Sequence, residues 1–264
     1  MLINTDLNLQ MTQLQQQACS ASLRRELPVT VLLEGLAFDI FTRDFEKPFD
    51  QVMIHSMRQT LRFLCRNIPG CRLGYTHGNR LLLVLQPSDP TAPAYCDYNV
   101  QKLCSTLTGI ATMKFNKTFE DMAKKYTADI GAGNKTTTIV RASGYINAVL
   151  NGAVFCCSCM NVPADQVSSY LFWQQQIAIE DSIQSVADYY FSREEWQGKT
   201  VDQLDALLRL KKDVHWNDYS APLKWGAACY RDDTQPEGWF LDPFMPLLTP
   251  DQSPYVDRWL SEQM

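Results

Sequence analysis

The sequence predicts an α+β protein with a ferredoxin-like core, in which helices back an antiparallel sheet. Three observations lead to this prediction. Residues 28–38 begin with a β-branched and aliphatic run that is typical of a buried strand. Residues 49–67 carry apolar side chains at three- and four-residue spacing, which indicates a helix with one buried face. Residues 71–80 and 81–85 then predict a hairpin whose turn is Gly78-Asn79.

The elements of this core are bounded by local signals. Gly35 breaks the first strand, at a point where the backbone can approach a ligand closely. Pro69-Gly70 ends the helix. The second arm of the hairpin is apolar on both faces, which indicates a strand inside the sheet. Together these elements form half of a split β-α-β unit.

Two more helices flank the core. Residues 4–22 are rich in Gln and weakly amphipathic, which predicts a lead-in helix. After a Pro-rich loop at residues 86–93, residues 97–126 predict a long helix. Four lysines of this helix are interpreted as a solvated face, with an RNA-facing stripe as the alternative. They are Lys114, Lys117, Lys124 and Lys125.

The remaining chain alternates between regular and irregular stretches. Residues 127–151 contain three glycines and predict loops. Residues 153–160 predict a strand in the interior of the sheet, and residues 164–190 predict another long helix. A short helix is expected at residues 201–211, whereas the prolines of residues 242–250 predict irregular structure.

Composition bounds the class of protein. A chain of 264 residues that is 45% hydrophobic and 20% charged is typical of a soluble globular protein with one large or two small domains. A net charge of -5 argues against a general nucleic-acid binder, because phosphate binding depends on Lys and Arg. Any RNA contact is therefore expected to be local or supplied by a partner. With neither a signal peptide nor a membrane-spanning apolar run, we expect a cytoplasmic protein.

The cysteines do not indicate a metal site. The total of nine is odd, and the cluster of Cys156, Cys157 and Cys159 has no histidine nearby. Buried reduced thiols are the favoured interpretation.

Several motifs resemble those of the tRNA-His guanylyltransferase family. They are Leu33-Glu-Gly-x-x-Phe38, Phe41-Thr-Arg, Lys47-Pro-Phe-Asp50 and Gly74-Tyr-Thr76, and further matches extend to Leu223-Lys224. Enzymes of that family add nucleotides to RNA 5′ ends in the 3′-to-5′ direction, with a palm domain and two divalent ions. The resemblance implies a palm-like domain at residues 1–160, lead-in helix included. Residues 161–264 would be a helical and irregular part that packs on the palm as one structural unit.

The departures from this family concentrate on residues that would bind metal and phosphate. The family's two metal-binding Asp residues are replaced by Glu34 and Asn79, and the acid beside the second is Arg80, although Gly35 is retained. Three basic residues of a later helix are replaced by Gln174, Gln176 and Glu180. These changes predict a catalytically degenerate, bacterial-type member without an intact catalytic or metal site.

Two side chains carry specific predictions. Arg80 is predicted to hydrogen-bond Glu34 as an internal substitute for the ion; the alternative is that it points to solvent on the opposite strand face. Lys199 is the main basic residue left in the matched motifs and is a candidate nucleotide or RNA contact. A purely structural turn in Gly198-Lys-Thr200 is the favoured alternative.

Three functions fit this sequence. The favoured one is a pseudoenzyme without cofactor that acts in a hetero-oligomer as a structural or regulatory partner of a catalytically intact relative, with tRNA or another RNA bound through the complex. The second is an active nucleotidyltransferase that uses Glu34 and Mg²⁺. The third is a nucleotide or RNA sensor that binds without turnover.

Overall fold

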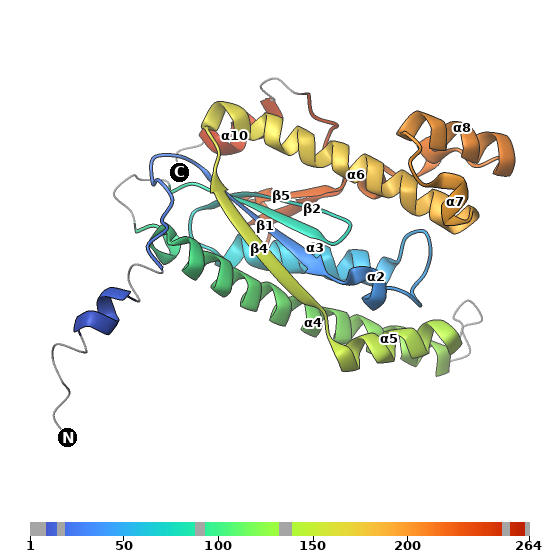
Figure 1. The fold of residues 1–264 in the computed structure, drawn as a ribbon, viewed down its shortest axis with the longest axis horizontal. Helices are drawn as coiled ribbons and strands as arrows, with labels where there is room; N and C mark the ends of the chain where they lie inside the picture. Colours follow the sequence, from blue (N-terminus) through green and yellow to red (C-terminus); the bar gives the residue numbers. More distant parts are fainter. Residues whose placement is uncertain (1–8, 15–18, 88–92, 132–138, 250–253, 262–264) are drawn as a thin grey trace.

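The structure is a computed structural model that describes residues 9–14, 19–87, 93–131, 139–249 and 254–261. Its centre is one six-stranded sheet in the order β4-β1-β3-β2-β5-β6, in which all neighbouring strands are antiparallel (Figure 1). The strands are β1 (Val29–Leu36), β2 (Cys71–His77), β3 (Arg80–Leu85), β4 (Val154–Asn161), β5 (Ala227–Arg231) and β6 (Trp239–Asp242). The predicted fold class, an antiparallel sheet backed by helices, is confirmed.

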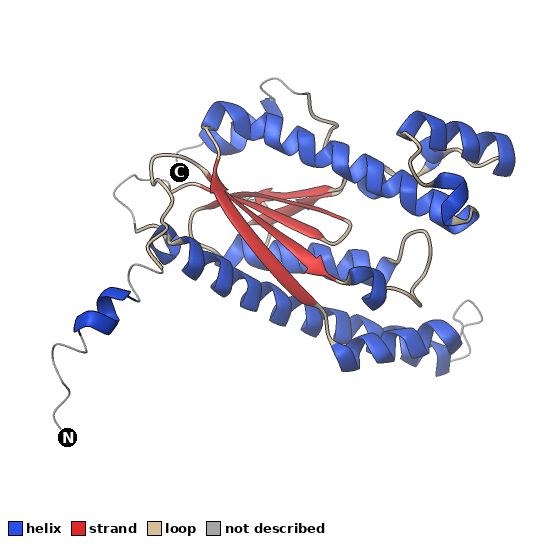
Figure 2. Cartoon of the chain, viewed as in Figure 1, coloured by secondary structure: helices blue, strands red, loops and turns tan. Residues whose placement is uncertain are grey.

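Helices lie on both faces of this sheet (Figure 2). They are α2 (Phe38–Phe41), α3 (Gln51–Asn67), α4 (Val100–Gly131), α5 (Ile139–Asn151), α6 (Val167–Tyr190), α7 (Arg193–Trp196), α8 (Val201–Lys212), α9 (Ala221–Lys224) and α10 (Pro254–Ser261). Helices α3 and α4 share one hydrophobic core with the sheet, and α6 and α10 share another with its opposite face. None of the helices in the described ranges is both long and apolar enough to cross a bilayer.

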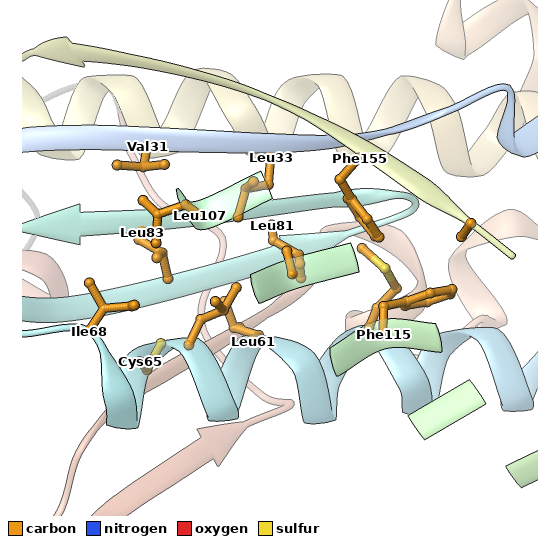
Figure 3. Close-up of a cluster of buried hydrophobic side chains, with 14 of the residues drawn as sticks. Val31, Leu33, Leu61, Cys65, Ile68, Leu81, Leu83, Leu107, Phe115 and Phe155 are labelled. Carbon is orange, nitrogen blue, oxygen red and sulfur yellow. The ribbon is translucent and has the colours of Figure 1, made fainter. Parts of the chain in front are cut away.

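Strand alternation decides which residues reach which core. Val31 and Leu33 of β1 point toward α3 and α4, where they pack with Leu61 and Phe115 (Figure 3). Successive side chains of a strand point to opposite faces. Glu34 therefore lies on the face that α6 covers.

Local signals predicted the N-terminal half of the sheet well. The strand, the helix and the hairpin lie within two residues of the expected bounds, and Gly78 adopts a φ of 49° in the hairpin turn. Helix α3 begins after Asp50, whose carboxylate accepts a hydrogen bond from the backbone of Met53 at 2.8 Å. Asp50 also accepts from the hydroxyl of Tyr145, which ties α3 to α5.

The expectation of loops between residues 127 and 151 is wrong. Helix α4 continues to Gly131, and α5 occupies Ile139–Asn151. Gly144 lies inside α5, where an added Cβ would be 2.7 Å from the Cβ of Asp44. This glycine therefore permits close packing of a helix rather than a turn.

The C-terminal residues contribute two strands that the sequence did not reveal. Strand β5 pairs with β2, and β6 pairs with β5, so both extend the sheet beyond the hairpin. Strand β4 pairs only with β1 and is an edge strand, which corrects the prediction that it lies in the interior. Of the predicted lead-in helix, residues 9–14 are helical and exposed, and part of the rest lies outside the described residues.

All nine cysteines are free thiols. Those of the cluster on β4 are half-buried rather than buried, and Cys159 lies with its Sγ 3.6 Å from that of Cys104 on α4. Burial raises the pKa of Cys159 to about 12, and the neighbouring Cys104 adds to this shift. A group of three or more His, Cys, Asp or Glu side chains that could hold a metal ion does not occur within the described residues.

Candidate functional site

The residues singled out in the sequence meet at one end of the sheet. Glu34 and Gly35 lie near the end of β1, Asn79 lies in the hairpin turn, and Arg80 is the first residue of β3. The strand register places Glu34 directly opposite Arg80. The sheet thus brings together the four positions that resemble a metal site.

Arg80 bridges two carboxylates. Its Nε donates a hydrogen bond to Oε1 of Glu34 at 2.7 Å, and its Nη1 donates to Oδ2 of Asp181 at 3.2 Å. The side chains of Arg80 and Glu34 are 26% and 37% exposed, so the pair is partly shielded from water. The predicted contact between Arg80 and Glu34 is confirmed. The guanidinium lies between Glu34 and Asp181, and any cation shared by these acids would have to displace it.

Asp181 is a site residue that sequence reasoning missed. It lies on α6, three residues after the buried Ala178, on the side of the helix that faces the sheet. Burial raises the pKa of Asp181, and the charge of Arg80 opposes this shift. Helical periodicity could have placed Asp181 on the inner face, but the contact with Arg80 spans 101 residues.

Asn79 closes the other side of the site. Its side-chain Nδ2 donates to the carbonyl of Gly35 at 2.9 Å, and the backbone N–H of Gly35 donates to the carbonyl of Asn79 at 3.0 Å. A Cβ at Gly35 would collide with the ring of Phe38. Gly35 is therefore required for packing, and its carbonyl oxygen is already engaged by an amide.

His77 is buried beside these charges. Its side chain is 4% exposed, and its Nδ1 lies 3.9 Å from Oδ2 of Asp181. Burial, reinforced by the nearby charge of Arg80, lowers the pKa of His77 to about 3, with Gln174 opposing the shift. The imidazole is thus neutral at physiological pH, and Arg80 supplies the fixed positive charge between the two acids.

A cavity of about 630 Å³ opens next to the Arg80 bridge. It lies between the segment from α2 to the start of α3, the hairpin turn, and helices α6, α7 and α9. Its charged lining residues are the acids Asp39, Glu46, Asp50, Asp181 and Asp188 and the bases Lys47, Arg80, Arg193 and Lys224. Because the acids and bases are mixed, this cavity lacks the strong positive field that favours a triphosphate.

The two candidate lysines differ in position. Lys199 is exposed in the turn before α8 and does not line the cavity. The adjacent Thr200 caps α8 and forms a capping box with Gln203, so the start of this helix accounts for the turn without a role in binding. Lys224 lines the cavity, and its buried Nζ donates to the carbonyl of Asn217 at 2.9 Å. The nucleotide or RNA contact for which Lys199 is a candidate stays a prediction.

The residues present do not fit a pair of divalent ions. Such ions prefer several oxygen ligands, above all carboxylates. Here the carboxylate of Glu34 is bound to a guanidinium, and Asn79 turns N–H groups toward the Gly35 carbonyl. This arrangement explains how the chain stabilises the site with its own charges.

Comparisons with known proteins bear on the fold and the family. The sequence profile of the family described as Thg1, tRNAHis guanylyltransferase, matches residues 11–144. A bacterial tRNA(His) guanylyltransferase-like protein in complex with ATP has 25% identity and a TM-score of 0.79, over 97% of this chain and all of that one. A bacterial relative in complex with GTP has 23% identity and a TM-score of 0.72 over the same shares. The tRNA(His) guanylyltransferase of Saccharomyces cerevisiae has 14% identity and a TM-score of 0.64, over 90% of this chain and 94% of that one. No match was found among curated proteins.

The sheet, its covering helices and the acid at the end of β1 define a palm of the nucleotidyltransferase type. Since the family profile covers half of the chain, the family is established as well. The chain belongs to the tRNAHis guanylyltransferase family.

Proposed function

We propose that this chain has lost nucleotidyl transfer and acts as a structural or regulatory subunit. Its partner would be a catalytically intact relative engaged in 3′-to-5′ nucleotide addition or RNA 5′-end handling. The observation that carries the proposal is the Arg80 bridge between Glu34 and Asp181. A fixed guanidinium supplies one positive charge without the open coordination positions that a reacting phosphate needs.

Retention of the fold supports a role other than catalysis. The structural match to the bacterial relative spans 97% of the chain at 25% identity. The departures noted in the sequence replace acids and bases, with Glu34, Asn79 and Arg80 of the site among them, whereas the apolar framework is intact. A chain that had lost every role would have accumulated changes in both sets. An interface preserved in an oligomer would explain why the apolar framework is kept while the acids and bases change.

A nucleotide sensor is the second candidate, and the cavity beside Arg80 favours it. At about 630 Å³ it is within the usual range for small-molecule sites. Two of the similar solved structures are described as complexes with ATP and GTP. Arg193 lines the cavity and offers one cation to an anionic ligand, although the acids of the lining weaken the attraction. An active enzyme that uses Glu34 is disfavoured, because that carboxylate is held by Arg80.

Incubation with labelled nucleoside triphosphates, Mg²⁺ and a set of tRNAs tests the loss of catalysis. Neither the purified wild type nor the Glu34→Ala variant is expected to yield extended RNA. Labelling by the wild type that disappears in Glu34→Ala, but not in the exposed control Glu26→Ala, would contradict the proposal. Stable co-purification and a defined mass with an intact relative test the partner role. A chain that stays monomeric in its presence argues against it.

The sensor is tested separately by binding of a fluorescent nucleoside triphosphate. Binding that is weakened by Arg193→Gln, in a protein without transferase activity, favours the sensor over the subunit. Lys211→Gln is the matched control, since its side chain pairs with Glu195 on the surface and does not line the cavity.

A further inference from the structure

A second cavity, of about 480 Å³, lies between the first half of α3 and the second half of α4. It is separated from the cavity at Arg80 by the start of α3, and Ile54 is the one residue that lines both. Its lining residues are Gln51, Val52, Ile54, His55, Arg58, Met122, Lys125 and Tyr126.

The charged residues of this cavity are all basic. Arg58 and Lys125 line it from facing helices, with His55 one turn before Arg58, and no Asp or Glu is among the lining residues. Within the described part of the chain neither Arg58 nor Lys125 makes an ion pair. The neighbouring Lys117 and Lys124, in contrast, pair with acids on the outer face of α4. Lys125 is exposed as well, but it differs from these two lysines because it lines the cavity and makes no ion pair with a described acid.

The basic groups of this cavity lie close enough for their charges to act on one another. The pKa of His55 is lowered by burial, then by Lys125, then by Arg58. Burial also lowers the pKa of Arg58, with no acid opposing the shift. A half-buried guanidinium beside a second cation is costly unless an anion joins them.

We propose that this cavity, here called the α3/α4 pocket and defined by the eight lining residues, binds a phosphate group. Arg58 offers a planar pair of N–H donors that matches phosphate oxygens, and Lys125 supplies a second positive charge. Tyr126 lines the same cavity, and its hydroxyl accepts a hydrogen bond from Nη1 of Arg141 at 3.2 Å. The phosphate belongs either to an RNA backbone or to a small phosphorylated molecule.

A local site of this kind agrees with the net charge of -5. An acidic protein attracts polyanions weakly overall, so a phosphate contact must come from a few cations placed together without neighbouring acids. The α3/α4 pocket is such a place. It lies outside the Arg80 bridge, so its occupation does not depend on whether the chain retains catalysis.

The NMR signal of His55 provides a direct readout of phosphate binding in the α3/α4 pocket. The chain has three histidines, of which His77 is buried and His215 lies apart on an exposed segment. The groups facing His55 are Arg58 on its own helix and Lys125 and Tyr126 on α4. In NMR spectra of histidine-labelled full chain, inorganic phosphate is expected to shift the His55 signal and raise its pKa. The other two histidines serve as internal controls, and His55→Gln assigns the signal.

Matched variants test the ligands. Arg58→Gln and Lys125→Gln are each expected to weaken phosphate binding about tenfold, the effect of losing roughly one charge-assisted hydrogen bond. Lys124→Gln removes the same charge from the next residue and is expected to change nothing, because Lys124 faces Glu120. Phosphate should also raise the unfolding temperature of the wild type but not of Arg58→Gln. A cooperative unfolding transition of Arg58→Gln without phosphate shows that the variant is folded.

A short RNA hairpin and inorganic phosphate, titrated in parallel at matched ionic strength, distinguish the sources. RNA binding that falls in Arg58→Gln and Lys125→Gln, but not in Lys124→Gln, assigns the pocket to an RNA backbone. Phosphate binding with the same pattern, but no RNA binding, assigns it to a small molecule. If neither probe moves the His55 signal, or if Lys124→Gln and Lys125→Gln act alike, the proposal is overturned.

Discussion

Replacing Arg80 by Met removes the guanidinium that joins Glu34 to Asp181 and keeps an unbranched apolar side chain on β3. Two carboxylates are then left without their shared cation. A hydrogen bond to a charged group contributes about 1.5–3 kcal/mol when shielded, and an exposed ion pair contributes less than about 1 kcal/mol. Since Arg80 and Glu34 are 26% and 37% exposed, we expect a coupling free energy of about 1–2 kcal/mol between them.

Urea unfolding of four proteins measures this coupling. The set is the wild type, Arg80→Met, Glu34→Gln and the double variant. The double variant should lose less unfolding free energy than the two single variants added together, by the coupling energy. Thermal unfolding gives a second reading, with a shift of roughly 2–4 °C for each kcal/mol in a chain of this size.

The exposed pair of Lys211 and Glu195, at 3.2 Å, is a matched control. Its coupling should be below about 0.5 kcal/mol, because both side chains are close to half exposed. Strict additivity for Arg80 and Glu34, or a coupling no larger than that of the control, would refute the idea that the bridge stabilises the site.

Four further outcomes follow from groups that are wholly or partly shielded from water. The pKa of His77 is lowered to about 3, so the unfolded chain gains a proton that the folded chain does not. The unfolding free energy should therefore fall as the pH drops from 6.5 toward 3, by up to about 1.4 kcal/mol per pH unit, and less steeply in His77→Gln. Tyr145→Phe leaves Asp50 without the hydroxyl it accepts from and should cost about 1–3 kcal/mol in urea unfolding. Burial also raises the pKa of Tyr145, so wild-type stability should decline above pH 10, where the unfolded tyrosine ionises. Cys159, with its pKa raised to about 12, should react with iodoacetamide at pH 8 more slowly than the exposed Cys19, as read by mass spectrometry.

Local pattern was enough to predict the half of the sheet around the hairpin. Helix α3 has one apolar stripe and a clear stop, and the Gly78 turn fixes the register of β2 and β3. The pairing of β1 with β3 places Arg80 opposite Glu34. The family resemblance indicated that the strands carrying these two residues are adjacent, and their opposite charges favoured the contact.

Features that depend on long-range packing were not predictable in this way. Strands β5 and β6 have five and four residues, too few for a period of two to stand out. Helix α5 contains Gly144, whose role is visible only where Asp44 packs against it. Asp181 joins the site only because α6 crosses the sheet, and no local signal reports that crossing.

Titration of Mn²⁺ into the full chain, followed by electron paramagnetic resonance, tests most directly whether Arg80 has replaced the ion. The titration is carried out with and without a nucleoside triphosphate. A triple variant restores an acidic site by combining Glu34→Asp, Asn79→Asp and Arg80→Glu. The wild type is expected to bind no Mn²⁺ through Glu34, and the restored variant is expected to bind it. Mn²⁺ binding by the wild type that Glu34→Ala abolishes would contradict the replacement of the ion by Arg80.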